Sequence, residues 1–592
     1  MRSLRFLSLS LVATLALAAV ASCQNSAPAS PDSDSSTPAT LVQLPSSNPP
    51  ATPGSFDQVI DRIVEREHYF VAQMKHAHPL VETYIQNMKS DKEMGATPVS
   101  DHYFLGRIDL SEGADDRLFL GQPGFGRKML DSITSLYSLH FVPLGFARMV
   151  LLDDDFQKRF YKLTFVRREF LGELRCLVID VQPREDVKRA GFLGRIWVED
   201  QDYNIVRYNG TYFPQPRNGG YYLHFDAWRL NMRPGVWLPA YIYSEESDLK
   251  YRMSQNLHFK SQTRLWGYDL KNLGRTEEFS SIQVDSSQAI KDTSEVAQDA
   301  TPVEAERMWQ RQAEDNTIER LQKIGLLAPS GEVDKVLTTV VNNLIVTNNL
   351  DIEPEIRARV LLTSPLESFT IGHTIVVSKG LLDVLPDEAS LAMVLARELG
   401  HIALGHQLDT KFAFNDRMFF ADEDTFSTFS FRRTAKEEEE ADQKAVELLT
   451  NSPYKDKLSN AGLFLKALDA RAPQLKNLIR ARLGDGLISG KTLRMSALLN
   501  GAPQLDERKK DQIAALPLGG RIKVDPWSNE TGMAKTKPVA LLSAREKMPF
   551  EVTPFMPFLT RYQKPGSGIT ASSAKADVAR KEGQQSQQQR PQ

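Results

Sequence analysis

The sequence offers little support for a disulfide-rich, nucleic-acid-binding or multi-span membrane protein. Its 592 residues contain two cysteines, Cys23 and Cys176, too few for a disulfide framework. The formal net charge of −3 provides no basic excess for a nucleic-acid partner. Beyond a short apolar run near the N-terminus, no stretch is long and apolar enough to span a bilayer. With 41% hydrophobic residues, the chain can still build two or more domains with their own cores.

The N-terminus has the pattern of a secretory signal, because two arginines precede the apolar run of residues 6–19. The run ends in Val-Ala-Ser-Cys at residues 20–23, which resembles the lipobox of bacterial lipoproteins. This resemblance implies a signal peptide over residues 1–22, cleavage before Cys23 and a lipid on Cys23. A transmembrane anchor is the alternative, but the run is short. We therefore expect a lipid-anchored protein of the bacterial cell envelope that faces the periplasm, and Gln24, in place of an aspartate, favours the outer membrane.

Composition divides the rest of the chain. Residues 23–55 and 566–592 are rich in small and polar residues, which predicts a disordered tether and a disordered tail. Residues 56–74 have helical periodicity. From about residue 100 to residue 270, short β-rich runs separated by turn signals predict an antiparallel meander. The predicted strands are residues 160–167, 174–181, 192–199, 205–213, 221–230, 237–243 and 257–268.

Two short motifs in this meander, Gly194–Glu199 and Gly235–Pro239, resemble the curved half-barrel of bacterial lipoprotein-carrier proteins. The resemblance implies that residues 56–295 form a β-rich domain around an apolar concavity that holds an acyl chain or a partner peptide. The alternative is a sheet packed on a helix. In that case five aromatic residues belong to the core or its rim: Phe192, Trp197, Tyr222, Trp228 and Trp237.

A nearly complete metal-binding motif lies at residues 394–406, Val-Leu-Ala-Arg-Glu-Leu-Gly-His-Ile-Ala-Leu-Gly-His. In H-E-x-x-H, two histidines four residues apart bind zinc from one face of a helix, and the glutamate acts as general base. Here Glu398 and His401 are in place, but Arg397 takes the first histidine position. A guanidinium stays protonated and has no lone pair to give to a metal.

The flanking sequence follows the pattern of one family. A predicted strand at residues 368–377 precedes Gly380–Leu382 and a helix that Pro386 opens, and Glu437–Asp442 begins a further helix. This combination resembles the gluzincin zinc metallopeptidases of the CAAX prenyl protease and heat-shock protease X type, peptidase family M48. The resemblance implies a mainly helical peptidase-like domain over residues 300–565, and hence an α+β fold class for the chain.

The resemblance also assigns roles to single residues. Glu398 corresponds to the general base, and His401 and Glu438 to two zinc ligands. Asp442 corresponds to the acid that orients a ligand histidine. In an intact site, zinc lowers the pKa of a bound water to about 7, the glutamate takes its proton, and the hydroxide attacks a peptide carbonyl. Read without its flanks, the run of four glutamates around Glu438 would be a solvated helix start.

The predicted strand over residues 371–377 corresponds to the edge at which this family holds a peptide substrate by strand addition. Ile371, His373 and Ile375 are therefore the candidate substrate-strand residues. Residues 412–431 are unusually aromatic and link the two site helices, either as a lid or as a packed insertion.

Two departures from the family bear on activity. Arg397 cannot bind zinc, and no histidine follows His406 to steady an oxyanion. His406 lies off the helical face of His401 and could replace the missing ligand only if the helix broke near Gly405, so we expect a surface histidine. We expect Arg397 to fill the metal position and to bond Glu438 through its planar fork.

These observations leave three functions open. The first is a zinc endopeptidase for protein turnover or assembly in the envelope, with its activity in question because of Arg397. The second is a pseudopeptidase that binds peptides or acts as a chaperone. The third is a lipid or lipoprotein carrier that works through the N-terminal sheet. The expected partners are protein or peptide clients and the membrane, and no nucleic acid.

Overall fold

The computed structural model describes most of the chain between residues 53 and 562. The described ranges are 53–74, 77–91, 95–109, 115–118, 156–185, 191–214, 223–251, 255–268, 302–406, 430–505, 522–524, 531–533, 550–554 and 556–562. Cys23, the predicted tether and tail, Tyr222 and residues 412–429 of the aromatic segment lie outside them. Within these ranges, no helix has the length and apolar character needed to cross a membrane.

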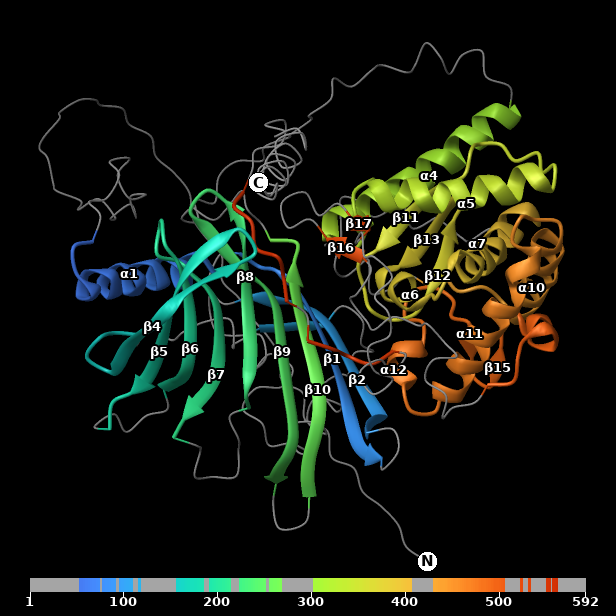
Figure 1. Ribbon diagram of the computed structural model, residues 1–592. Coiled ribbons are helices and arrows are strands. Elements are labelled where there is room, and N and C mark those ends of the chain that lie inside the picture. The colour runs from blue at the N-terminus through green and yellow to red at the C-terminus, as the bar shows by residue number, and fades with distance from the viewer. Residues whose placement is uncertain are drawn as a thin grey trace, which may run out of the picture. The chain divides into compact units, whose positions relative to one another are not determined.

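A ten-stranded antiparallel sheet forms the N-terminal part, in the order β3-β2-β1-β10-β9-β8-β7-β6-β5-β4 (Figure 1). The predicted meander is therefore confirmed. The strands are β1 Leu80–Asp91, β2 Gly95–Asp109, β3 Asp115–Leu118, β4 Tyr161–Leu171, β5 Leu174–Pro183, β6 Gly191–Glu199, β7 Ile205–Phe213, β8 Phe225–Arg233, β9 Val236–Tyr251 and β10 Gln255–Trp266.

Helix α1, Phe56–Met74, packs on one face of this sheet (Figure 1). Its buried residues recur at helical spacing, from Ile60 and Ile63 to Phe70 and Met74. A buried ion pair at 2.7 Å between Glu67 of α1 and Arg229 of β8 fixes the helix to the sheet.

The aromatic residues of the meander pack in cores. Phe192, Trp228 and Trp237 are at most 2% exposed, and Trp197 is 6% exposed. Phe192 lies in the cluster on the α1 side, and the three tryptophans lie in the cluster that continues into the peptidase-like domain. These contacts favour the alternative of a packed sheet over an open concavity.

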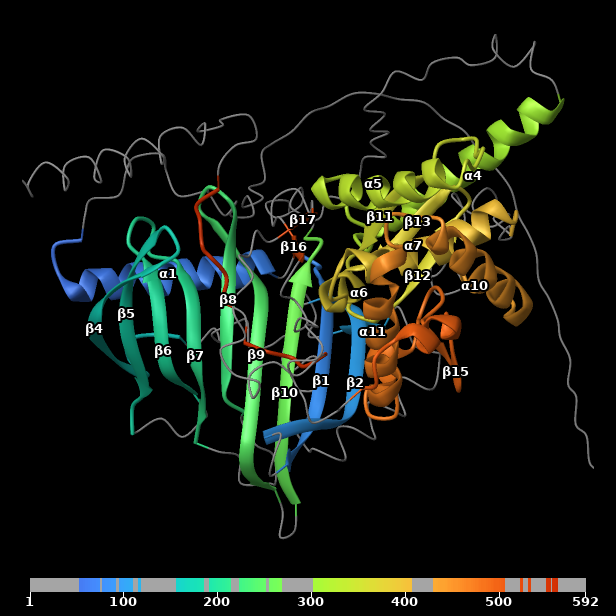
Figure 2. The same ribbon diagram turned by 45° about the vertical axis from the view of Figure 1, so that its right-hand side comes forward.

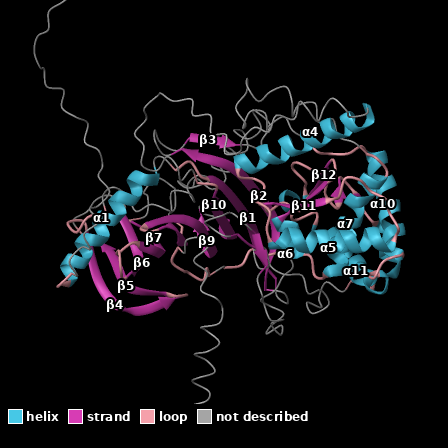
Figure 3. Ribbon diagram, turned by 90° about the horizontal axis from the view of Figure 1, so that it is seen from above, coloured by secondary structure: helices cyan, strands magenta, loops and turns pink. Residues whose placement is uncertain are grey.

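The peptidase-like part is built on a small mixed sheet, in the order β11-β13-β12 (Figure 3). Its strands are β11 Arg357–Leu361, β12 Ser368–Ile371 and β13 Thr374–Ser378. The α-helices are α4 Pro302–Ile324, α5 Glu332–Thr347, α6 Lys379–Val384, α7 Glu388–Ala403, α10 Ala435–Thr450, α11 Leu458–Arg471 and α12 Lys476–Ile479. The peptidase-like part also has two short 3₁₀ turns, Lys455–Lys457 and Ser496–Gly501. Two further strand pairs are β14 Ile488–Ser489 with β15 Thr492–Leu493, and β16 Ile522–Val524 with β17 Thr531–Met533.

The sheet and the peptidase-like part meet through buried polar residues of β1 and β2. Glu82 accepts hydrogen bonds from the Ser364 backbone N–H at 2.6 Å and from the Tyr103 hydroxyl at 2.9 Å. Asp101 accepts the backbone N–H groups of Asn477 and Leu478 at 2.7–3.0 Å, at the start of α12. Buried polar residues such as Glu82 break the alternation of polar and apolar residues that is expected of a half-buried strand. The sequence pattern therefore does not predict β1.

Residues 550–554 and 556–562, red in Figures 1 and 2, cross one face of the large sheet, and the Phe550 ring also packs on Phe464 of α11 with ring centroids 6.1 Å apart. The backbone of Phe550 and Val552 bonds the Gln86 side chain of β1 at 2.8 Å. Further along, the Leu559 carbonyl accepts the Glu173 N–H at 2.9 Å, beside the β4–β5 turn.

Candidate active site

Helices α7 and α10 lie side by side and bring the motif residues together (Figures 1 and 2). Asp387 caps α7 by accepting the Ser390 N–H at 2.9 Å, and Thr434 opens α10 in a capping box with Glu437. Gly400 allows the close contact, because an added Cβ would lie 2.9 Å from the Ala441 carbonyl oxygen. The two caps and this glycine set the positions from which Arg397 and Glu438 face each other.

Arg397 lies at the centre of the site with no exposed surface. One guanidinium nitrogen donates to Glu438 of α10. The other donates to Oε1 of Glu398 at 3.1 Å, and Nε lies 3.6 Å from Oδ1 of Asp442. Burial lowers the pKa of Arg397, but the carboxylates of Glu438, Glu398 and Asp442 raise it more, so the side chain stays charged. The predicted contact between Arg397 and Glu438 is present.

Glu398, the predicted general base, is engaged in the same network. Its Oε1 accepts the Ser368 hydroxyl at 2.7 Å as well as the Arg397 N–H. Burial raises the pKa of Glu398, while Arg397 and Ser368 act in the opposite direction. One of the two carboxylate oxygens of the predicted base is thus held by two donors.

Glu438 is 2% exposed, whereas Glu439 beside it is exposed, so the reading of the glutamate run as a solvated helix start is wrong for Glu438. Asp442 lies one turn further along α10 and accepts the Met495 N–H at 3.2 Å instead of a histidine. Its predicted role of orienting a ligand histidine is therefore not seen.

His401 is buried, and its Nδ1 lies 3.0 Å from Nδ1 of His406. The helix ends at Ala403 and Gly405 takes a left-handed φ of 70°, which turns the chain back. The expectation of a surface histidine at 406 is therefore wrong: its side chain is 9% exposed and its Nε2 lies 3.2 Å from Glu440. His406 thus contacts Nδ1 of His401, whereas Nε2 of the same ring faces Glu438.

Three residues that the sequence analysis does not predict complete the site. Arg494 places Nε 3.4 Å from Glu438, and the Arg433 backbone N–H donates to Asp485 at 3.1 Å. Burial and the neighbouring Glu438 charge raise the pKa of Asp485 to about 8. Arg433 lies just before α10, whereas Asp485 and Arg494 follow it at distances that no local pattern marks.

A zinc ion does not fit the residues present. Within the described ranges, no group of three or more histidine, cysteine, aspartate or glutamate side chains could hold a metal. Two donor atoms remain: His401 Nε2 and Glu438 Oε1, 3.6 Å apart, each buried without a hydrogen-bond partner. The third position belongs to Arg397, whose fixed positive charge repels a divalent cation. Burial and that charge also lower the pKa of His401 to about 2, so its ring is neutral.

The predicted substrate strand divides between two strands and a turn. Ile371 ends β12, His373 lies in the following turn, and Ile375 belongs to β13. The prediction of one edge strand over 371–377 is wrong, because β13 lies between β11 and β12, so that of the two strands in this range only β12 is an edge. His373 Nδ1 lies 3.5 Å from Glu314 of α4, away from the site.

The chain itself covers the free side of β12. Ser368 and Asp485 exchange both backbone hydrogen bonds at 3.0 Å. Glu367 Oε2 accepts the backbone N–H groups of residues 482–484 at 2.7–3.1 Å and holds that segment in place. The Arg433 guanidinium donates to the Thr370 hydroxyl at 2.6 Å. A peptide that added to β12 would have to displace these contacts.

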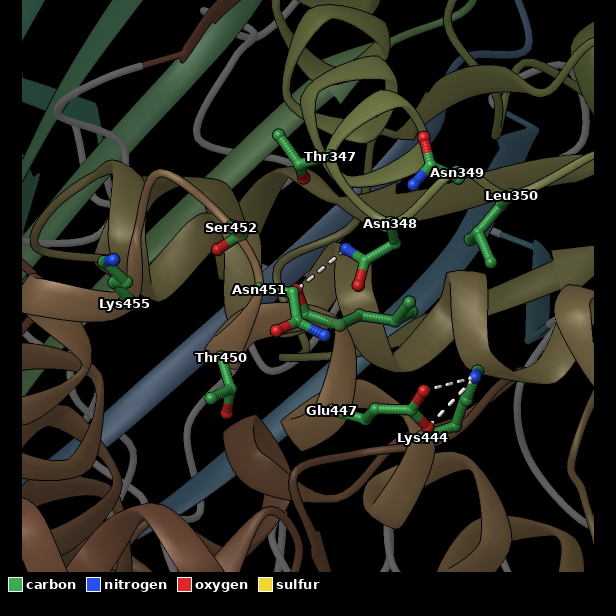
Figure 4. A pocket seen from close by; sticks show the side chains of 11 residues that line it. Thr347, Asn348, Asn349, Leu350, Lys444, Glu447, Thr450, Asn451, Ser452 and Lys455 are labelled. Carbon is green, nitrogen blue, oxygen red and sulfur yellow. Dashed lines mark hydrogen bonds and ion pairs between the residues drawn. The ribbon is translucent and has the colours of Figure 1, made fainter.

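A polar pocket of about 500 Å³ lies elsewhere, where the C-terminal ends of α5 and α10 meet (Figure 4). Asn348 bridges the two helices by donating to the Leu448 carbonyl at 3.0 Å, and Lys444 pairs with Glu447 at 3.0 Å. None of the predicted site residues lines this pocket.

Comparison with known proteins gives one family match. The profile described as Peptidase family M48 matches residues 333–510, and no curated protein matches the chain. A solved outer membrane lipoprotein-sorting protein domain from Vibrio parahaemolyticus is 9% identical, covers 37% of this chain and 96% of its own, and has a TM-score of 0.20. A LolA superfamily protein from Nitrosomonas europaea is 10% identical, with coverages of 38% and 94% and a TM-score of 0.18. Such low scores support no conclusion about what the sheet binds.

The family match spans α5, the three-stranded sheet, α7 and α10, and therefore includes every residue of the Arg397 network described above. Residues 333–510 of this chain are thus a domain of peptidase family M48.

Proposed function

We propose that this chain is a non-hydrolytic member of the metallopeptidase family M48, and that its peptidase-like domain serves as a binding scaffold in the bacterial envelope. The observation that carries the proposal is the buried Arg397, which takes a ligand position and bonds both Glu438 and Glu398. A metalloprotease needs three protein ligands and a free base. Here Arg397 replaces one ligand, and two donors occupy one oxygen of the base.

The test is the metal content of the purified protein together with a casein-type cleavage assay. We expect no stoichiometric zinc and no cleavage. Arg397→His restores the His-His-Glu ligand set and should gain zinc affinity, whereas Arg397→Ala should not. One zinc per chain in the unmodified protein would refute the proposal.

If the protein cleaves peptides despite Arg397, Glu398→Gln tests whether that cleavage depends on the motif. Because an amide cannot accept the proton of a water molecule, this substitution should abolish any cleavage that runs through the motif. Cleavage that survives both Glu398→Gln and a chelator would place the chemistry outside the motif.

The zinc endopeptidase stays a second candidate because His401 Nε2 and Glu438 Oε1 face each other without partners. It would require Arg397 to leave a buried position with three carboxylate neighbours. The carrier function of the sheet is a third candidate, and acyl chains that co-purify with the delipidated protein would favour it over both.

We propose further that the protein is lipid-anchored through Cys23, on the evidence of the lipobox-like sequence that precedes it. Cells grown with a labelled fatty acid should label the unmodified chain and not Cys23→Ser. Equal labelling of the two would show that the lipid, if present, is attached elsewhere.

A further inference from the structure

An exposed patch of aromatic and basic side chains lies on β4, the strand that ends the ten-stranded sheet. Phe165 and Phe170 are 46% and 68% exposed. Phe56, the first residue of α1, contacts Phe165 edge to face with ring centroids 6.2 Å apart. With Arg168, these residues form what we call the β4 patch.

Strand register places the patch on one face of the sheet. Phe165 pairs with Ile179, Arg168 with Leu177 and Phe170 with Arg175. Ile179 and Leu177 belong to the core on the α1 side, so the three β4 side chains project from that same face. Phe165 lies beside the start of α1, and Phe170 lies five residues further along the strand without such cover.

The patch carries positive charge. The Arg168 side chain is exposed and has no hydrogen bond or ion pair with any residue of the described ranges. Arg167 pairs with Glu169 at the opposite face, and Lys162 on that face is also exposed. Burying Phe165 and Phe170 against a partner would remove apolar surface from water, while Arg168 would retain a polar environment only beside an anion.

We propose that the β4 patch docks on the surface of an anionic lipid bilayer. Exposed phenylalanines beside an arginine with no side-chain partner in the described ranges suit the boundary between acyl chains and phosphate headgroups. The chain that leads from Cys23, the predicted lipid site, enters the folded body at Phe56, which is itself part of the patch. A lipid on Cys23 would hold the patch near the bilayer, and contact of the patch with the bilayer would orient the body.

A second copy of the chain is a less suitable occupant of β4. The strand has a bulge between Phe165 and Arg167, which interrupts the regular row of N–H and C=O groups. The adjacent Arg167 and Arg168 would meet like charges in an antiparallel pairing with themselves. Both features are typical of edge strands that resist pairing.

The test uses the chain from Gln24 to Gln592, without lipid, and sedimentation with vesicles of phosphatidylethanolamine and phosphatidylglycerol. We expect the protein to sediment with these vesicles and not with pure phosphatidylcholine, and the binding to weaken with added salt. The double variant Phe165→Ser/Phe170→Ser should lose at least tenfold in binding, and Arg168→Glu should lose binding mainly at low salt.

The matched control is Met556→Ser/Phe558→Ser, which removes side chains that are 69% and 65% exposed on a different segment. It should bind vesicles like the unmodified chain. Absence of binding by the unmodified chain, or equal losses in the control and patch variants, would overturn the proposal. The proposal would also be overturned if the unmodified chain formed a dimer in solution and the patch variants did not. None of these results depends on zinc or peptidase activity.

Discussion

Arg397 is the residue on which the stability of the site depends. Its guanidinium is fully buried among Glu438, Glu398 and Asp442, so each partner needs the other to offset the cost of leaving water. Removing Arg397 leaves buried carboxylates without their cation, and removing Glu438 takes one of three partners from the guanidinium, whereas replacing both residues by apolar groups removes one charge of each sign.

A double-mutant cycle tests this dependence. Arg397→Met and Glu438→Leu should each lower the free energy of unfolding by about 3–5 kcal/mol, and the double variant by clearly less than their sum. Arg195 and Asp180 form an exposed pair at 2.7 Å and supply the control, with an expected coupling under about 1 kcal/mol. Denaturant unfolding measures all of them. Additive losses at Arg397 and Glu438 would show that the contact does not couple the two helices.

Asp334 offers a pH-dependent test at a second residue. It caps α5 by accepting the Gly331 N–H at 3.1 Å, and burial raises its pKa to about 6. In the unfolded state Asp334 loses its proton at lower pH than in the folded state. The contribution of Asp334 to stability is therefore largest below about pH 4 and falls as pH rises to about 6. Relative to Asp334→Asn, the unmodified protein should lose roughly 1–3 kcal/mol across that window. A pH-independent difference between the two melting curves would contradict this.

At the scale of elements, the local signals in the sequence locate the helices better than the strands. Asp387 and the Thr434–Glu437 box cap α7 and α10 by contacts within four residues, and such signals can be read directly. The segment at residues 482–484 is held by Glu367, more than a hundred positions away. No local pattern predicts that contact, nor the order β11-β13-β12. The turn at Gly405 was readable in principle, since glycine after a helix favours the left-handed conformation that returns His406 to the site.

Gly484 tests whether the cover over β12 depends on close packing. A Cβ at this position would lie 2.4 Å from the Phe369 ring and 2.7 Å from the Ser368 carbonyl oxygen. Gly484→Ala should therefore destabilise the protein by about 1–3 kcal/mol and speed hydrogen exchange at the Ser368 amide. Gly501→Ala is the control, because nothing lies within 4 Å of its added Cβ. Unchanged exchange at Ser368 would show that the segment accommodates the methyl group without leaving β12.

For the whole molecule, the junction between the sheet and the M48 domain determines whether they unfold together. Glu82 and Asp101 are 1% and 4% exposed and bond loops of the peptidase-like part at Ser364 and at residues 477–478. Fold class follows from the sequence because it depends on repeated strand patterns and on the motif helices. The junction does not, because it depends on polar side chains whose partners lie hundreds of residues away.

Weakening the junction should separate the two parts in thermal unfolding. In Glu82→Gln, an amide N–H₂ would face the Arg264 guanidinium or the Ser364 N–H, which now donate to the two carboxylate oxygens at 2.9 and 2.6 Å. Asp101→Ala removes the acceptor for the first N–H groups of α12. We expect one calorimetric transition in the unmodified protein and two in the double variant, since the core on the α1 side of the sheet is separate from the core that continues into the M48 domain. Glu169→Gln, at an exposed ion pair, is the control and should keep the single transition. A double variant that still unfolds in one transition would show that apolar contacts, including residues 550–562 on the sheet, hold the two parts together without these carboxylates.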